Sequence, residues 1–289
     1  MTNFISQHTA NTDSNAAVGV FDSGIGGLSV LKHLRQRLPH ECMLYLADSA
    51  YAPYGERSVE ELIARSIKIT EFFLQHNIKA MVIACNTATA AAVAVLRERY
   101  PNLLIIGMEP GLKPAALQSK NKIVGVLATR STLQSQKFNL LREQLTHELH
   151  AQFIPQACVG LVNQIELGDL NASAILDLLR QYVPPLLAQG IDTLVLGCTH
   201  YPFVETQIRQ VIAEVPGQQK SIQIIDTGEA VARRLESLLG THHLLRATSL
   251  SSAEKTLMVW ATGNTETLQS AMRFILAPDE MVSVLGIVV

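Results

Sequence analysis

The sequence contains no run of about 20 consecutive apolar residues, the length that an α-helix needs to cross a bilayer. Its 23 Lys and Arg residues are balanced by 25 Asp and Glu and form no cluster, so no nucleic-acid-binding surface is expected. Residues 1–17 are polar and lack the basic start and apolar core of a signal peptide, and we expect a disordered N-terminal tail there. These absences predict a soluble, cytoplasmic protein that binds neither membranes nor nucleic acid.

Motifs that indicate nucleotide or phosphate chemistry are also incomplete or missing. The run Gly24-Ile25-Gly26-Gly27-Leu28-Ser29 lacks the last glycine of the GxGxxG dinucleotide fingerprint. No GxxxxGK stretch followed by Ser or Thr is present, which excludes the common phosphate-binding loop. Phe21-Asp22-Ser23-Gly24 is similar to a phosphatase aspartate loop, but the second aspartate two positions on is absent.

Only four cysteines are present, and they form no CxxC pair and no zinc-finger spacing. We therefore expect no metal site, and we expect the thiols to stay reduced in a cytosolic protein. Cys42 precedes a predicted strand and Cys158 falls in a connection, so both are interpreted as structural. Cys85 and Cys198 instead end apolar runs of strand type.

The rest of the chain has the pattern of a large α/β protein. Hydrophobic residues make up 48% and charged residues 17%, which allows a substantial core. Apolar runs at 18–21, 43–47, 81–84 and 103–108 alternate with helical patterns. Continuous apolar strands separated by helices predict a parallel sheet that is covered by helices on both faces.

The same pattern then restarts. Predicted strands at 123–129, 152–154, 193–196 and 222–226 follow, and Cys198 repeats the position of Cys85 113 residues later. We predict two similar, doubly wound, mainly parallel α/β domains that are related by a pseudo-twofold duplication. The first comprises residues 18–112 and 227–289, since the late strand at 256–261 is expected to return to it, and the second comprises residues 113–226.

Ligands bind at the carboxyl ends of parallel strands, so Cys85 and Cys198 are expected to face each other across the cleft between the two domains. The start of a helix after each thiol favours the thiolate. Asn86, Thr87 and Thr199 can donate hydrogen bonds there, and Asp22 and His200 can exchange protons with a thiol.

Simpler explanations remain open for each of these residues. A cysteine at the end of a buried strand is often a small core residue, and only the matched pair favours chemistry. Asp22 could form a turn, and His200 could cap a helix. Glu166 could be an ordinary solvated helix residue.

Four separated motifs, in this order, resemble the glutamate racemase family of the aspartate/glutamate racemase superfamily. They are Phe21-Asp22-Ser23-Gly24-Ile25-Gly26-Gly27, Pro53-Tyr54-Gly55, Cys85-Asn86-Thr87-Ala88-Thr89 and Gly197-Cys198-Thr199-His200. The resemblance covers roughly residues 18–239. His200 bears on the substrate, because the similar aspartate racemases typically carry Glu after the second Cys-Thr.

The resemblance implies a cofactor-independent isomerase that interconverts L- and D-glutamate and supplies D-glutamate for peptidoglycan, and hence for cell wall biogenesis and cell shape. Cys85 would take the proton from D-glutamate with help from Asp22, and Cys198 from L-glutamate with help from His200, which Glu166 would support. It also implies a homodimer, and whether a peptidoglycan precursor activates the enzyme stays open on the sequence. The implied substrate contacts are Asp22, Ser23, Pro53, Tyr54, Gly55, Asn86, Thr87, Thr129, Thr199 and His200.

Three other functions stay open on the sequence. The protein could racemise aspartate or another acidic amino acid. It could be a hydrolase in which one cysteine is the nucleophile and the other is incidental. It could also be a non-catalytic binder, of a DNA topoisomerase for instance, as some racemases of this family are reported to be.

Overall fold

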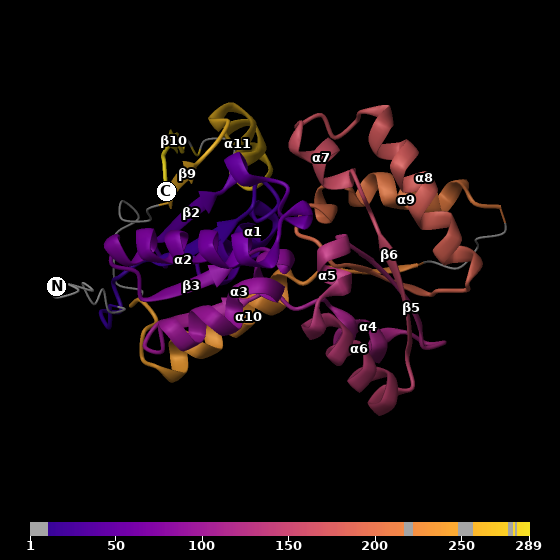
Figure 1. Cartoon of the computed structure of the whole chain (residues 1–289), viewed down its shortest axis with the longest axis horizontal. Helices are drawn as coiled ribbons and strands as arrows, with labels where there is room; N and C mark the ends of the chain where they lie inside the picture. The colour runs from indigo at the N-terminus through magenta and orange to yellow at the C-terminus, as the bar shows by residue number, and fades with distance from the viewer. Residues whose placement is uncertain (1–10, 217–221, 248–256, 277–279, 281) are drawn as a thin grey trace.

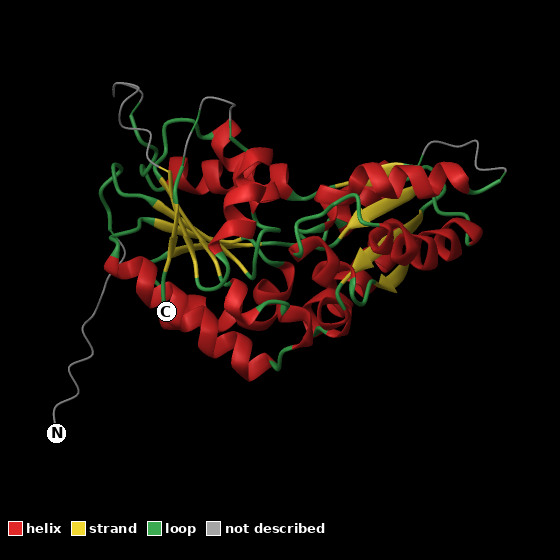
Figure 2. Cartoon of the chain, turned by 90° about the horizontal axis from the view of Figure 1, so that it is seen from above, coloured by secondary structure: helices red, strands yellow, loops and turns green. Residues whose placement is uncertain are grey.

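The computed structural model describes residues 11–216, 222–247, 257–276, 280 and 282–289, and contains two separate parallel sheets (Figures 1 and 2). The strands are β1 (Val18–Asp22), β2 (Met43–Ala47), β3 (Ala80–Ile83), β4 (Leu104–Gly107), β5 (Ile123–Ala128), β6 (Gln152–Ala157), β7 (Thr193–Leu196), β8 (Gln223–Ile225), β9 (Leu257–Ala261) and β10 (Val284–Gly286).

Helices follow almost every strand. They are α1 (Leu28–Arg37), α2 (Val59–Gln75), α3 (Asn86–Arg99), α4 (Leu112–Gln118), α5 (Arg130–Gln134), α6 (Gln136–Leu149), α7 (Leu161–Glu166), α8 (Ser173–Ala188), α9 (Glu205–Glu214), α10 (Gly228–Thr241) and α11 (Thr265–Ala271). Among them, α2 shows the local signal most clearly: Ser58 and Glu61 form the predicted capping box, with each side chain bonded to the backbone N–H of the other.

The order of strands in the two sheets supports the predicted duplication. The second sheet has the order β6-β5-β7-β8, and the first contains the matching series β2-β1-β3-β4. The first sheet continues from β2 to β9 and then β10, so the late strand returns to the first sheet as predicted. We call the first sheet with its helices the first unit and the second sheet with its helices the second unit. The residue boundaries given for the two domains stay a prediction.

Helices cover both faces of each sheet (Figure 2), as continuous apolar strands require. In the first unit, α1 and α10 pack together on one face through side chains such as Leu31 and Leu235, and α2 and α3 cover the other face. In the second unit, α8 and α9 pack on one face, and α4 and α6 on the other. Because the strands within each sheet are parallel, their carboxyl ends lie at one edge of that sheet.

Several element bounds differ from those predicted. The strand predicted at 152–154 extends to Ala157, and the helix predicted from about residue 132 is two helices that meet at Ser135. Ser135 interrupts the helix because its hydroxyl oxygen accepts a hydrogen bond from the Phe138 N–H and caps a new start. Residues 1–10 of the predicted N-terminal tail lie outside the described residues, whereas Asn11 donates a backbone hydrogen bond to Ile78.

A buried ion pair closes the amino-terminal end of the first sheet. The Lys79 ammonium lies 2.5 Å from Glu41 Oε2, and the two side chains are 0% and 2% exposed. Lys79 also donates to the carbonyl oxygens of Ser14 and Leu244. One ammonium therefore connects the start of β3 to two segments that are distant in the sequence.

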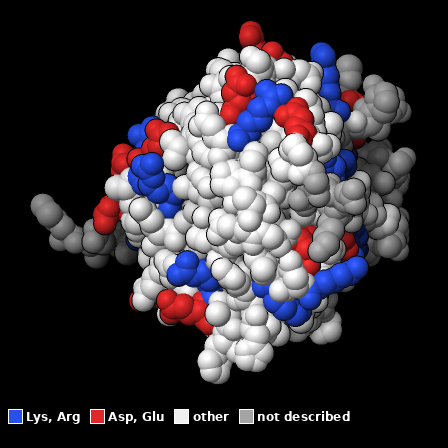
Figure 3. Space-filling view, turned by 90° about the vertical axis from the view of Figure 1, so that its right-hand side faces the viewer, with Lys and Arg blue, Asp and Glu red and all other residues white. Residues whose placement is uncertain are grey.

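Within the described residues, no helix combines the length and the apolar character needed to cross a membrane. On the outer face of the second unit, charges of both signs lie in small groups around a mostly uncharged centre (Figure 3).

We predict that Lys79→Met lowers the free energy of unfolding by about 3 to 5 kcal/mol, because it leaves the Glu41 charge buried without its partner. Denaturant unfolding followed by circular dichroism measures this change. Arg180→Met is the matched control, since Arg180 pairs with Glu214 on the surface and its replacement should lower the free energy of unfolding far less. Equal effects of the two substitutions would contradict the prediction.

Candidate active site

Cys85 lies where the sequence places it, at the carboxyl end of a buried strand. It follows β3 with extended backbone angles and forms the N-cap of α3, and it is 5% exposed. Cys198 follows β7 in the second sheet and is 7% exposed. Both are free thiols.

The α-helix predicted to start directly after the second cysteine is absent. Tyr201–Val204 form one 3₁₀ turn, and α9 begins only at Glu205. Val204 separates the two segments, because its backbone angles (φ −114°, ψ 21°) lie outside the helical region. The helix dipole therefore acts on Cys85 and not on Cys198.

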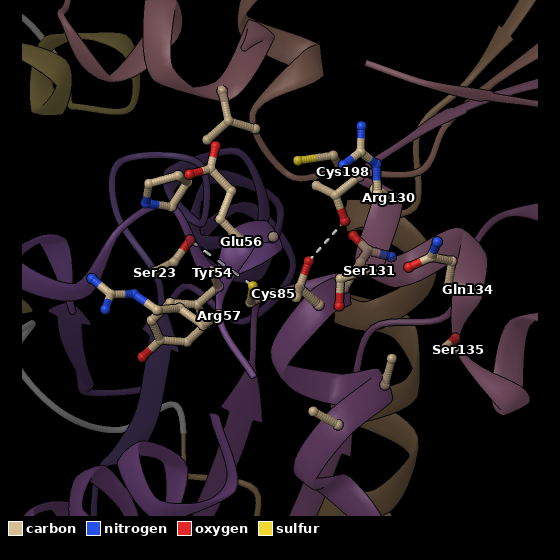
Figure 4. Close-up of a pocket in the computed structure, with 18 of the residues that line it drawn as sticks. Ser23, Tyr54, Glu56, Arg57, Cys85, Arg130, Ser131, Gln134, Ser135 and Cys198 are labelled. Atoms are coloured by element: carbon tan, nitrogen blue, oxygen red, sulfur yellow. Dashed lines mark hydrogen bonds between the residues drawn. The ribbon is translucent and has the colours of Figure 1, made fainter. Parts of the chain in front are cut away.

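One cavity of about 770 Å³ contains both thiols. Figure 4 shows Cys85 and Cys198 reaching it from two sides, with Ser23 and Tyr54 beside Cys85. Both units contribute to its walls. Nine residues expected at the site line it: Ser23, Pro53, Tyr54, Gly55, Asn86, Thr87, Thr129, Thr199 and His200.

Asp22 and Cys85 are adjacent buried acids. Asp22 is 0% exposed, and its Oδ2 accepts a hydrogen bond of 2.7 Å from the Gly27 N–H. Burial raises the pKa of Asp22, although the nearby His200 opposes the change. Burial and the Asp22 charge also raise the pKa of Cys85 well above its usual range, against a smaller opposite effect of the Ala88 N–H.

The direction predicted for the pKa of Cys85 was therefore wrong. The start of α3 favours the thiolate, but the loss of water and the neighbouring carboxyl outweigh it. A cation that enters the cavity would reverse this balance, because a positive charge stabilises both Asp22 and Cys85 in their ionised forms.

His200 connects Cys198 to Glu166. Its Nδ1 lies 3.7 Å from Cys198 Sγ, and its Nε2 lies 2.5 Å from Glu166 Oε1. Burial lowers the pKa of His200, but the hydrogen bonds to Cys198 and Glu166 outweigh burial and raise it well above its usual value. Glu166 thus lies beside the histidine, as the resemblance implied, and does not line the cavity.

The glycine-rich loop after β1 lies against this pair. A Cβ at Gly26 would lie 2.4 Å from His200 Nδ1, and one at Gly24 would lie 1.9 Å from Glu166 Oε1. The Ile25 N–H donates a hydrogen bond of 2.9 Å to the same Glu166 oxygen. These glycines therefore allow the first unit to approach the second, a purpose that the motif alone did not reveal.

Some polar atoms in the site have no partner. Asn86 Oδ1, Asn86 Nδ2 and Asp22 Oδ1 are buried without a hydrogen bond. Asn86 lines the cavity, and since buried polar atoms are rarely left unpaired, its amide marks a position where a polar ligand would bind. Asp22, which was also expected to contact the substrate, does not line the cavity.

Other lining residues were not expected from the sequence. They include Arg57, Arg130, Ser131, Gln134 and Asn163. Arg130 follows directly after the expected contact Thr129, which was the one signal available. Among the described residues, no group of three or more His, Cys, Asp or Glu side chains is arranged to hold a metal ion.

Comparisons with known proteins agree with this geometry. The sequence profile of the Asp/Glu/Hydantoin racemase family matches residues 26–235. The chain belongs to this family. It is 49% identical, over 271 residues, to the glutamate racemase of Ectopseudomonas mendocina (strain ymp), a match that covers 94% of this chain and 98% of that protein. The protein is therefore an enzyme of the racemase class.

Solved structures show the same fold. A glutamate racemase isoform from Bacillus anthracis superimposes with a TM-score of 0.80 at 30% identity, over 95% of this chain and 98% of that one. The Escherichia coli glutamate racemase, solved with L-glutamate and the activator UDP-MurNAc-Ala, gives a TM-score of 0.77 at 29% identity. That match covers 94% of this chain and 99% of the other.

We predict that Glu166→Gln lowers the pKa of His200, since the Glu166 charge raises it. A raised folded-state pKa stabilises the protein fully below about pH 6.5, and this stabilisation is lost as the pH rises through the folded value. The free energy of unfolding of the wild type should therefore be higher than that of the variant. This difference should be largest at low pH and should shrink as the pH rises. NMR titration of the His200 ring and denaturant unfolding across pH measure both effects.

Glu205→Gln is the control for charge removal, because Glu205 pairs with Arg209 on the surface. It should leave the His200 titration unchanged. The same His200 titration in wild type and Glu166→Gln would contradict the prediction.

Proposed function

We propose that the protein interconverts L- and D-glutamate by proton transfer between two cysteines, without a cofactor. The observation that carries this proposal is that Cys85 and Cys198, from different units, line one cavity. Inversion at a carbon by proton transfer needs a base on one face and an acid on the other. A thiolate and a thiol on two sides of the substrate meet that need, and they exchange roles in the reverse reaction.

Each thiol has its own proton partner in this mechanism. Cys85 removes the proton from D-glutamate, and Asp22 exchanges a proton with Cys85. Cys198 removes the proton from L-glutamate, and His200 exchanges a proton with it. The 3.7 Å separation of Cys198 Sγ and His200 Nδ1 supports this second pairing, and Glu166 orients His200 from the other ring nitrogen.

Substrate binding would complete the electrostatics of the site. The unpartnered Asn86 amide lines the cavity and can bind a carboxylate. The positive ammonium of the amino acid would lower the raised pKa of Cys85, so the thiolate would form only when substrate is bound. Ser23, Thr87, Thr129 and Thr199 offer hydroxyl donors along the same walls.

The biological role is proposed from the resemblance to glutamate racemases. We infer that the D-glutamate made here supplies peptidoglycan synthesis in the cytoplasm.

We assign three further residues to the substrate pocket because they line the cavity: Pro53, Tyr54 and Gly55. The homodimer expected from the resemblance stays a prediction.

We predict that Cys85→Ser and Cys198→Ser each nearly abolish racemisation, because a serine hydroxyl is far less acidic than a thiol and cannot act as the base. Circular dichroism of L- and D-glutamate, with purified protein in buffer free of pyridoxal phosphate, measures the rates. Cys42→Ser is the matched control, since Cys42 lies outside the cavity lining, and should keep wild-type activity. Wild-type rates in either active-site variant would overturn the two-base mechanism.

A solvent isotope experiment separates this reaction from cysteine hydrolysis. In deuterium oxide, racemisation predicts deuterium at Cα of the recovered glutamate, whereas a hydrolase predicts a trapped acyl-enzyme. Comparing glutamate with aspartate in the same assay tests the substrate. Faster turnover of aspartate would reassign the enzyme.

We further propose activation by a nucleotide-linked peptidoglycan precursor, because the similar E. coli enzyme was solved with the activator UDP-MurNAc-Ala. Adding this compound to the circular dichroism assay should increase the rate of racemisation. UDP alone is the control for the nucleotide part. Equal rates with and without UDP-MurNAc-Ala would refute the activation.

A further inference from the structure

Asp48 is a buried carboxylate next to the active site that the mechanism does not use. It follows β2, is 0% exposed and does not line the cavity. Its Oδ2 accepts hydrogen bonds from the Tyr54 hydroxyl at 2.5 Å and from Arg65 Nε at 3.0 Å. Its Oδ1 accepts from Arg65 Nη2 at 2.6 Å and from the Thr262 hydroxyl at 2.8 Å. All of this carboxylate's hydrogen-bonding capacity is thus used within the protein.

Arg65 is itself held on every side. It lies on α2 and is 5% exposed. Its third nitrogen, Nη1, donates to the Val289 carbonyl oxygen at 2.6 Å, and its guanidinium lies 3.9 Å from the centre of the Tyr51 ring. A planar guanidinium with two bonds to one carboxylate leaves Asp48 little freedom to rotate.

Tyr54 connects this cluster to the cavity. Its ring is 2% exposed, and it packs in the same apolar cluster as Cys85 while lining the cavity. Figure 4 shows Tyr54 beside Cys85 and Ser23. The next residue, Gly55, approaches the second unit, since a Cβ there would lie 3.2 Å from Thr129 Cβ.

The backbone of Asp48 also contacts the site. Its N–H donates a hydrogen bond of 2.9 Å to the carbonyl oxygen of Asp22, the proposed proton partner of Cys85. Asp48 therefore contacts two neighbours of the Cys85 thiol: Asp22 through its backbone N–H, and Tyr54 through its side chain.

We propose that Asp48 and Arg65 are positioning residues for the racemase reaction. They fix the Tyr54 ring in the cavity wall beside Cys85, where the substrate binds. This role rests on the proposed two-cysteine mechanism. Neither residue touches the cavity, so both act through Tyr54. Loss of either partner would leave an unpaired buried charge, and the ring would then move away from its place beside Cys85.

The first test uses Tyr54→Phe, which keeps the ring and removes only the hydroxyl that Asp48 holds. We expect kcat/KM for racemisation to fall about tenfold, the effect of one lost hydrogen bond to a charged group. Arg65→Met should lower it roughly a hundredfold, as expected for a misplaced reacting group. Arg65→Lys keeps the charge but loses the bidentate contact. Its kcat/KM should therefore lie between those of wild type and Arg65→Met.

Isotope effects separate positioning from a general loss of structure. Substrate deuterated at Cα reports which proton transfer limits the rate. If Tyr54 positions Cys85, the variants should show a larger isotope effect with deuterated D-glutamate, whose proton Cys85 removes. With deuterated L-glutamate the effect should become smaller, because reprotonation by Cys85 then limits the reaction.

Lys79→Met is the matched control. It also breaks a buried ion pair in the first unit, but at the amino-terminal ends of the strands, far along the sheet from the cavity. At a temperature where all the proteins are folded by circular dichroism, it should be destabilised and still racemise glutamate with wild-type kcat/KM and isotope effects.

The outcomes are distinct. Wild-type kcat/KM and isotope effects in folded Tyr54→Phe and Arg65→Lys would overturn the positioning role, even if Arg65→Met fails to fold. An equal loss of activity in Lys79→Met would also overturn it, because a general destabilisation would then explain the result. A wild-type enzyme that does not racemise glutamate would instead overturn the proposed function on which this role rests.

Discussion

The Glu166 carboxylate joins the two units at the active site, and the histidine beside Cys198 depends on it. One of its oxygens accepts from the Ile25 N–H of the first unit and lies 2.5 Å from His200 of the second. The loop can reach this oxygen only because Gly24 and Gly26 have no side chains. This contact between the two units therefore also sets the orientation of the histidine beside Cys198.

Burial gives the site its chemical character. Burial raises the pKa of both Cys85 and Asp22, and the Asp22 charge raises that of Cys85 further. His200 keeps a raised pKa only through its partners. The two halves of the site are thus electrostatically unlike, although the chain repeats the same fold around them: an acidic residue accompanies one thiol, and a paired histidine accompanies the other.

Much of the fold and of the site could be predicted from the sequence. Continuous apolar strands and helical periodicity indicated the parallel sheets, and the repeated position of Cys85 and Cys198 indicated two strand ends at one cleft. Local patterns could not reveal contacts between distant segments. Arg65 reaches Asp48 and the Val289 carbonyl, which lies 224 residues further along the chain, and no spacing rule connects them. The pKa of Cys85 was predicted in the wrong direction for the same reason.

The sequence by itself determined which groups are available: two thiols after buried strands, an aspartate, a histidine, and glycines at one turn. These follow from local preferences and periodicity, which act over a few residues. Only the tertiary structure decided how they are used. Burial, the pairing of His200 with Glu166 and the support of Tyr54 by Asp48 and Arg65 each depend on groups that meet only in the folded chain, because the electrostatic energy of a group depends on its surroundings in space.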